Sequence, residues 1–136
     1  METIYIENDI KIFFVTAKTY PDGILAAHQQ LHSMVPFSYD RKYFGVSRPE
    51  NKGEIVYRAA TEETFEGEAT KYNCESLTLK KGNYISLIIS HYRQDLPSIG
   101  IAFQKLLAHP NIDPEGYCVE WYLNETDVNC MVRLND

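Results

Sequence analysis

Hydrophobic and polar residues alternate in several short segments, and two longer segments carry apolar residues at helical spacing. Residues 4–16 are rich in Ile, Phe, Val and Tyr, which predicts one long strand with a bend near Asn8. The turn sequence Tyr20-Pro21-Asp22-Gly23 follows, and Pro36 closes the next segment. Between these two breaks the spacing predicts a helix whose apolar stripe contains Ile24, Ala27, Leu31, Met34 and Val35.

Two shorter strands follow this first helix. Residues 43–47 and 54–60 have the composition of strands. The sequence Pro49-Glu50-Asn51-Lys52-Gly53 between them predicts a turn. The first half of the chain therefore has the order strand, helix, strand, strand.

The second half of the chain repeats this order. Residues 84–91 predict a strand, and a helix is expected after Asp95 as N-cap, with Pro97 in its first turn. Residues 117–123 and 128–134 predict the last two strands. The helix expected between residues 84–91 and 117–123 has an apolar stripe that contains Ile99, Ala102, Phe103, Leu106 and Leu107.

The offsets between the halves support a duplication. Tyr43 and Tyr117 are 74 positions apart, and so are Glu54 and Val128. We therefore expect one α+β domain over residues 1–136 with a duplicated βαββ repeat. Two antiparallel sheets would lie side by side, with a helix on one face of each and a central ligand groove.

The expected domain boundaries follow from these elements. Repeat one spans about 3–60 and repeat two about 77–134. The connector at about 61–76 is rich in glutamate, and we expect it to be a solvated loop. The glutamates of this connector and its border are Glu62, Glu63, Glu66, Glu68 and Glu75.

Composition and charge narrow the possible functions. The chain has 136 residues, of which 44% are hydrophobic and 24% charged, as expected for a globular domain. It has 13 basic and 19 acidic residues and a formal net charge of −6, which argues against direct binding of nucleic acid. The sequence shows neither a signal peptide nor an apolar run long enough for a membrane span. We therefore expect a cytoplasmic protein without a membrane partner.

Cysteine and histidine spacing gives no metal or redox motif. Cys74, Cys118 and Cys130 are too few for a complete disulfide framework and contain no CxxC pair. His28 and His32 have a spacing that can hold zinc, but no third ligand is evident. We expect neither a metal nor another cofactor.

The segment 117–123 carries the main chemical candidate. Side chains alternate across a strand, so Cys118, Glu120 and Tyr122 share one face. The opposite face, with Tyr117, Val119, Trp121 and Leu123, is apolar and is expected to pack on a helix. A glutamate in such a strand is unfavourable unless it is solvated, paired or used. A solvent-facing Glu120 on an edge strand remains the alternative.

Four motifs together resemble a known family. The chain is similar to the gyrase-inhibitory-protein-like small-molecule-binding domain, which is also the effector-binding domain of bacterial AraC-type and MerR-type multidrug regulators. The resemblance covers residues 77–134 well and the first half mainly in element order. The motifs are Leu79-Lys80-Lys81-Gly82-Asn83-Tyr84, Leu96-Pro97-Ser98-Ile99, Glu120-Trp121-Tyr122-Leu123-Asn124 and Cys130-Met131-Val132-Arg133-Leu134.

The resemblance implies a function and a site. The domain would bind hydrophobic, often cationic small molecules in its groove, with Glu120 as the charge partner beside Tyr122. A buried carboxylate favours a cation, and aromatic walls add cation–π attraction of about 0.5–2 kcal/mol per ring. No helix-turn-helix segment is present, so we expect a stand-alone member of the family. Other candidate wall residues are Tyr84, Ile88 and Tyr92, expected on one face of their strand, and Tyr57. Phe44 and Val46 are further candidates, because the 74-residue offset aligns them with Cys118 and Glu120.

Two other functions remain open at this point. In an enzyme of this family, a hydrolase, Glu120 would be the general base and Tyr122 would polarise the substrate. A domain of the gyrase-inhibitor type would instead bind a protein partner, whose identity the sequence does not give. The net charge of −6 permits such a partner but does not select it.

Overall fold

The strands and helices of the chain divide between two units. The computed structural model describes residues 1–50 and 52–135, so Asn51 of the predicted turn lies outside the described residues. Unit 1 contains Met1–Asn8 and Lys80–Asp136, and unit 2 contains Asp9–Leu79. The chain therefore starts in unit 1, passes through the whole of unit 2 and returns.

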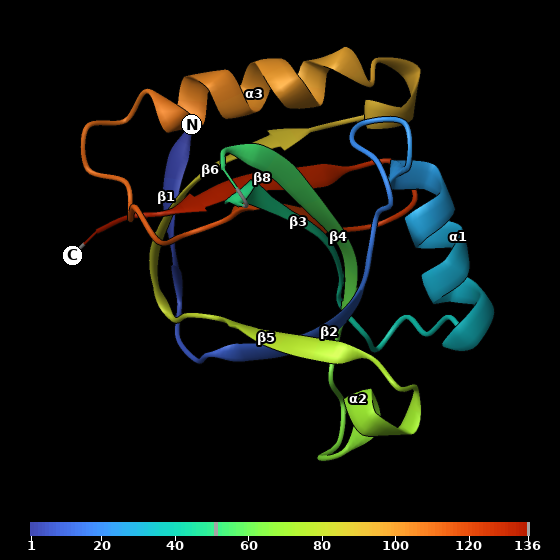
Figure 1. Ribbon diagram of the computed structural model, residues 1–136. Coiled ribbons are helices and arrows are strands. Elements are labelled where there is room, and N and C mark those ends of the chain that lie inside the picture. Colours follow the sequence, from blue (N-terminus) through green and yellow to red (C-terminus); the bar gives the residue numbers. More distant parts are fainter. Residues whose placement is uncertain (51, 136) are drawn as a thin grey trace. The chain divides into compact units, whose positions relative to one another are not determined.

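Unit 1 contains four antiparallel strands with a helix on one face (Figure 1). Its strand order is β1-β6-β8-β7, and α3 packs on β6 and β8. Buried Ala102 and Leu106 of α3 contact a cluster that includes Val128 and Cys130 of β8. The elements are β1 (Glu2–Ile6), β6 (Gly82–Ile89), a 3-10 helix η1 (Tyr92–Gln94), α3 (Pro97–Leu107), β7 (Cys118–Tyr122) and β8 (Val128–Arg133).

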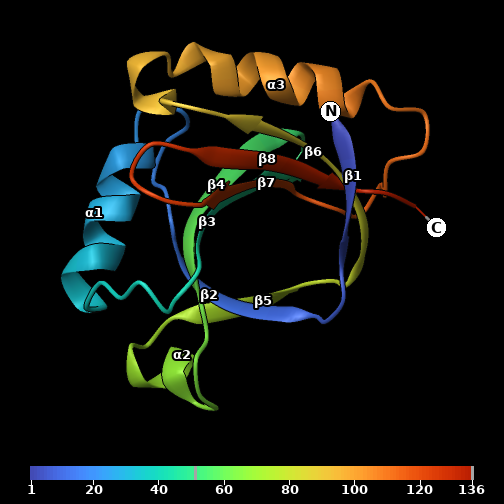
Figure 2. The ribbon, with the colours of Figure 1, turned by 180° about the vertical axis from the view of Figure 1, so that it is seen from behind.

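Unit 2 has the same plan. Its strand order is β3-β4-β2-β5, and α1 packs on β2 and β4 through Ala27 and Leu31. Figure 2 shows the second, short helix α2 between β4 and β5 along the chain. The elements are β2 (Ile10–Thr16), α1 (Ile24–Met34), β3 (Tyr43–Glu50), β4 (Glu54–Glu62), α2 (Glu68–Lys71) and β5 (Glu75–Leu79).

The predicted α+β class and the βαββ order of both halves are confirmed. Both helices form where the apolar stripes predict them, because one stripe can be buried against a sheet while the rest stays solvated. Pro97 is the first residue of α3, where its missing N–H costs nothing. The predicted capping role of Asp95 is wrong: Leu96 is the N-cap, and no side chain caps this helix end.

The long strand predicted over residues 4–16 is two strands in different units. Ile4 of β1 pairs with Tyr84 of β6, whereas Phe14 of β2 pairs with Ala60 of β4. The exposed segment 7–9 separates them. Strand propensity predicts that a segment is extended, but it does not predict the strand with which that segment pairs. The sequence pattern therefore could not show this division.

The acidic connector is not a solvated loop. It contains α2 and leads into β5, which pairs with β2. Glu68 is 1% exposed, and the side chain of Glu63 is only 6% exposed. The expectation of a solvated segment was therefore wrong for these two glutamates, because each has a cationic partner elsewhere in unit 2.

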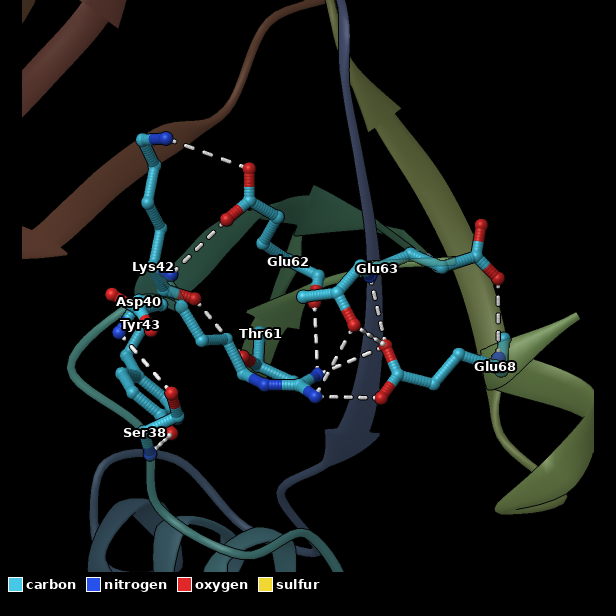
Figure 3. A network of polar contacts seen from close by, with 11 residues as sticks. Ser38, Asp40, Lys42, Tyr43, Thr61, Glu62, Glu63 and Glu68 are labelled. Carbon is cyan, nitrogen blue, oxygen red and sulfur yellow. Dashed lines mark hydrogen bonds and ion pairs between the residues drawn. The ribbon is translucent and has the colours of Figure 1, made fainter. Parts of the chain in front are cut away.

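Figure 3 shows the network around Glu68. Arg41 donates two hydrogen bonds to its carboxylate, Nη1 to Oε1 at 3.0 Å and Nη2 to Oε2 at 2.6 Å. The backbone N–H and hydroxyl of Thr64 also donate to Oε1, at 2.8 and 3.0 Å. Burial by itself would raise the pKa of Glu68, but the hydrogen bonds from Arg41 and Thr64 outweigh it and lower the pKa. The network fixes α2 to the segment before β3.

The helices of the described residues are short. Within residues 1–50 and 52–135, no helix has the length and apolar character needed to cross a membrane.

Candidate functional site

The side chains of β7 divide between the two faces of the unit 1 sheet. Cys118 and Tyr122 pack against the cluster that contains the α3 residues. Glu120 pairs with Cys130, which belongs to the same cluster. Residues of one parity share a face, so Glu120 lies on the face that α3 covers. These residues share one face, as expected, but α3 covers this face rather than the opposite one that was predicted.

Glu120 is held by its neighbour on the same face. The hydroxyl of Tyr122 donates a hydrogen bond to Oε1 of Glu120 at 2.5 Å. Both side chains are half-buried. A short hydrogen bond to a carboxylate is strong and orients the acceptor. The pair therefore presents a fixed carboxylate at a partly dry position.

Tyr92 joins this pair from another element. Its ring lies against that of Tyr122, with centroids 5.7 Å apart and planes tilted by 40°. The prediction that Tyr92 shares one strand face with Tyr84 and Ile88 is wrong. Instead, β6 ends at Ile89, and His91 adopts a left-handed conformation with φ of 55° before η1. That turn brings Tyr92 to the α3 side of the sheet, into the core cluster.

Two thiols lie near the carboxylate. Burial raises the pKa of Cys118 to about 11, and the charge of Glu120 adds to the effect. Burial likewise raises the pKa of Cys130 to about 12, with contributions from Glu120 and Cys118. Both thiols are therefore neutral near pH 7, and they add apolar surface to the site rather than nucleophiles.

Tyr84 and Ile88 lie on the opposite face of the same sheet. Tyr84 pairs with Arg133 and Ile88 with Asn129, whereas the helix-facing residues of β8 are Val128, Cys130 and Val132. Tyr84 is buried, and its hydroxyl donates to the carbonyl of Lys80 at 2.6 Å. These two candidates therefore do not share a face with Glu120.

The candidates of unit 2 also divide between two faces. Tyr57 on β4 lies on the side of α1: its hydroxyl is 2.8 Å from Nε2 of His28, a residue of that helix. Phe44 pairs with Ala60, and Val46 pairs with Arg58, so both point away from α1. Phe44 and Val46 are fully buried.

The expected equivalence of Phe44 and Val46 with Cys118 and Glu120 therefore fails. Phe44 and Val46 lie on the sheet face away from α1, whereas Cys118 and Glu120 lie on the face that α3 covers. The offset of 74 residues misaligns these two strands by one residue. A shift of one residue moves every side chain of a strand to the other face of the sheet. Matching the elements alone could not reveal this shift.

Unit 2 has an aromatic and polar cluster that the sequence analysis did not identify. The ring of Tyr20 stacks on that of Tyr57, with centroids 6.2 Å apart, and His28 meets the same ring edge-on at 5.7 Å. Burial, with a smaller contribution from His32, lowers the pKa of His28 to about 4. The imidazole is therefore neutral at pH 7. The spacing of His28 and His32 was the available signal, but it was considered only for zinc.

The described residues contain no group of three or more His, Cys, Asp or Glu side chains that could hold a metal ion. The Glu120 site offers a carboxylate and two phenol rings. Such a group can pair with a cation, or it can accept a proton.

The comparisons with known proteins find likeness in structure. No family model matches the chain, and the search of curated proteins finds no match at its threshold. An integron cassette protein from Vibrio cholerae has a TM-score of 0.76 and 12% identity, over 98% of this chain and 95% of that one. The protein SAV2435 bound to tetraphenylphosphonium has a TM-score of 0.58 and 13% identity, over 97% and 93%.

Two further solved structures differ in what they are said to do. A Staphylococcus aureus MU50 protein provisionally assigned to bacterial transcription regulation has a TM-score of 0.59 and 11% identity, over 97% of each chain. A hydrolase from Listeria innocua has the same TM-score and 10% identity, over 98% of this chain and 90% of that one. At these identities the likeness shows the fold and does not select among the functions.

Proposed function

We propose that this chain is an effector-binding domain for hydrophobic cations, with Glu120 as the ionic partner of the ligand. The observation that carries the proposal is the hydrogen bond from Tyr122 to a half-buried Glu120, beside the ring of Tyr92. The proposed site thus uses the expected residues that share one face, and it leaves out Tyr84 and Ile88 on the other.

The physical argument concerns desolvation. A half-buried carboxylate has lost part of its hydration, and a cation with an apolar body can pair with it without bringing back water. The half-buried ring of Tyr122 can contact that apolar body and add about 0.5–2 kcal/mol through cation–π attraction, whereas the buried ring of Tyr92 already has the guanidinium of Arg93 over it. The neutral thiol of Cys118 places no competing charge beside the ligand.

The comparisons support this class of ligand. Tetraphenylphosphonium, which is bound to SAV2435, is a cation surrounded by aromatic rings. The Staphylococcus aureus protein assigned to transcription regulation is consistent with a regulatory role for such binding. Both are similar in fold alone, so the choice of Glu120 rests on the geometry of this chain.

The test is a calorimetric titration of the protein with tetraphenylphosphonium. We expect saturable binding that weakens about tenfold or more in Glu120→Gln, since tenfold corresponds to about 1.4 kcal/mol and a broken buried charge pair costs more. Glu125→Gln is the matched control, because it removes the same charge from the exposed turn of the same hairpin. Equal affinities in the wild type and Glu120→Gln would refute the proposal.

A hydrolase is the second candidate, and the same hydrogen bond favours it. A carboxylate oriented by a phenol can act as a general base on water when an electrophilic substrate lies within reach. Among the solved structures of this fold is a hydrolase from Listeria innocua. Turnover of small esters or epoxides that Glu120→Gln abolishes would favour the enzyme, whereas binding without turnover favours the effector domain.

A further inference from the structure

A cation of the chain itself lies on one ring of the proposed site. Arg93 follows Tyr92 in η1, and its Cζ atom is 5.8 Å from the centroid of the Tyr92 ring. Its Nε–H donates a hydrogen bond to the hydroxyl oxygen of Tyr92 at 3.3 Å. The ring of Tyr92 lies in turn against that of Tyr122, with centroids 5.7 Å apart. The guanidinium therefore occupies a position on an aromatic ring that the cation of a ligand could take.

The partners of Arg93 differ from those of the other arginines. Among the residues that the structure describes, the other four each form an ion pair with a carboxylate, and Arg93 forms none. Its polar contact is the hydroxyl of Tyr92, and its charge lies over the ring of the same residue. The four ion pairs join Arg41 to Glu68, Arg48 and Arg58 to Glu50, and Arg133 to Asp113. Arg93 is thus held by an aromatic residue of the site rather than by a carboxylate.

This contact lies at the surface of unit 1. Arg93 is exposed, whereas the Tyr92 side chain beneath it is only 8% exposed. Because an exposed side chain covers this part of the ring, a change of its rotamer is enough to uncover it. An exposed cation–π contact and a hydrogen bond as long as 3.3 Å are weak, and a released arginine side chain regains rotamer entropy. The guanidinium can therefore be replaced by another cation.

The charge of Arg93 also acts on the rest of the site. The hydrogen bond to Tyr92 is the main cause of its raised pKa, and the charges of Tyr92, Glu125 and Tyr122 add to the effect. The guanidinium is therefore charged at pH 7 and lies within electrostatic range of Tyr122, whose hydroxyl holds Glu120. A ligand cation that pairs with Glu120 would have this like charge nearby, which weakens its binding.

We propose that Arg93 is an internal competitor of the ligand at the Glu120 site. In the free protein its guanidinium occupies the ring of Tyr92, and a hydrophobic cation has to displace it before that ring becomes available. Arg93 thus limits the affinity of the site for cations. This inference rests on the proposed function, because it concerns the regulation of the same site.

Calorimetric titration with tetraphenylphosphonium tests the competition. In Arg93→Gln the competing cation is absent, and we expect binding about threefold or more tighter than in the wild type, as an exposed cation–π contact would give. Lys105→Gln is the matched control, because it removes the same charge from the exposed last turn of α3. A charge at the solvated surface is screened by salt, so this control should change the affinity by less than about twofold.

A second variant separates displacement from simple repulsion. Tyr92→Phe keeps the ring and the net charge but removes the hydroxyl that accepts the hydrogen bond from Arg93. The guanidinium is then held less firmly, so we expect tetraphenylphosphonium to bind more tightly than in the wild type, by a smaller factor than in Arg93→Gln. Repulsion between charges alone predicts no change in this variant. The Nε–H resonance of Arg93, assigned by its absence in Arg93→Gln, should also move on saturation with tetraphenylphosphonium toward the position of a solvated arginine.

The outcomes distinguish this inference from the proposed function. Unchanged or weaker binding in Arg93→Gln, while binding to the wild type still depends on Glu120, would overturn the competition and leave the proposed function intact. An equal gain in Lys105→Gln would also overturn it, because net charge and not the position of Arg93 would then set the affinity. Absence of binding to the wild type and to Arg93→Gln alike would refute the proposed function, and this inference with it.

Discussion

At the scale of single residues, burial decides which polar groups are charged. Glu68 stays ionised inside unit 2 because Arg41 and Thr64 donate to it. His28 is in the opposite situation: it is half-buried beside Tyr57, and burial lowers its pKa to about 4. The free-energy cost of burying a charge is therefore offset by hydrogen bonds for Glu68. For His28 it is avoided, because the imidazole loses its proton.

The pKa of His28 predicts a dependence of stability on pH. The unfolded chain takes up a proton at His28 near pH 6.5, whereas the folded protein takes it up only near pH 4. Stability should therefore fall as the pH falls through this window, by about 2 kcal/mol between pH 7 and 4.5. His28→Gln should remove this part of the loss, as measured by urea unfolding at both pH values. An identical loss in the variant and the wild type would contradict the pKa shift.

At the scale of elements, the short helix α2 depends on one buried ion pair. Glu68 is its first residue and pairs with Arg41, which precedes β3. Few apolar contacts hold so short a helix: Ala69 is its only buried apolar residue among those described. The ion pair therefore positions a segment that helix propensity alone would leave disordered.

Removal of that pair should be costly. In Glu68→Gln the guanidinium of Arg41 stays buried without a counter-charge, and we expect a loss of about 3–5 kcal/mol in the free energy of unfolding. Glu66→Gln in the same segment is exposed and should change stability by less than about 0.5 kcal/mol. Urea unfolding curves of the two variants provide the comparison. If both behave alike, the pair contributes little to the position of α2.

At the scale of the whole molecule, the first strand belongs to the unit formed by the end of the chain. β1 pairs with β6 over Glu2–Ile6, and Ser86 donates to the carbonyl of Glu2 across this pairing. The other three strands of unit 1 lie within Lys80–Asp136. Unit 1 is therefore discontinuous in sequence, and its edge is completed by residues far from the rest.

Removal of residues 1–8 should affect the two units differently. Without β1, the outer edge of β6 loses its hydrogen-bond partners, and the buried Ser86 hydroxyl loses its acceptor. We expect amide hydrogen exchange in β6 to accelerate while β2 and β4 keep their protection. Exchange followed by mass spectrometry on the truncated and full-length proteins measures both effects. Uniform acceleration over all strands would contradict the division into units.

The sequence predicted the positions of the helices and strands better than it predicted which strands pair with one another. The helices begin close to Pro21 and at Pro97, and their apolar stripes face the sheets as expected. The division of residues 4–16 between two units and the burial of Glu68 were not predicted. Both depend on partners distant in the sequence, and a local pattern contains no information on such partners.

The candidate site was predicted in part for the same reason. Alternation correctly grouped Glu120 with Tyr122, since parity within one strand is a local property. Three other features are not local properties of the sequence. They are the sheet face on which α3 packs, the turn that moves Tyr92 to that face, and the offset between the two repeats. The Oδ1 atom of Asn129, unsatisfied among the described residues, could not be predicted either, because whether a buried oxygen is paired depends on the groups that surround it.

Thus the sequence by itself determined the α+β class, the order of the elements and the apolar stripes of the helices, because each follows from the period of a local pattern. Only the tertiary structure decided which face of β7 the helix covers, which strands complete each sheet and which polar groups are paired. These depend on register, and a change of one residue in register exchanges the two faces of a strand.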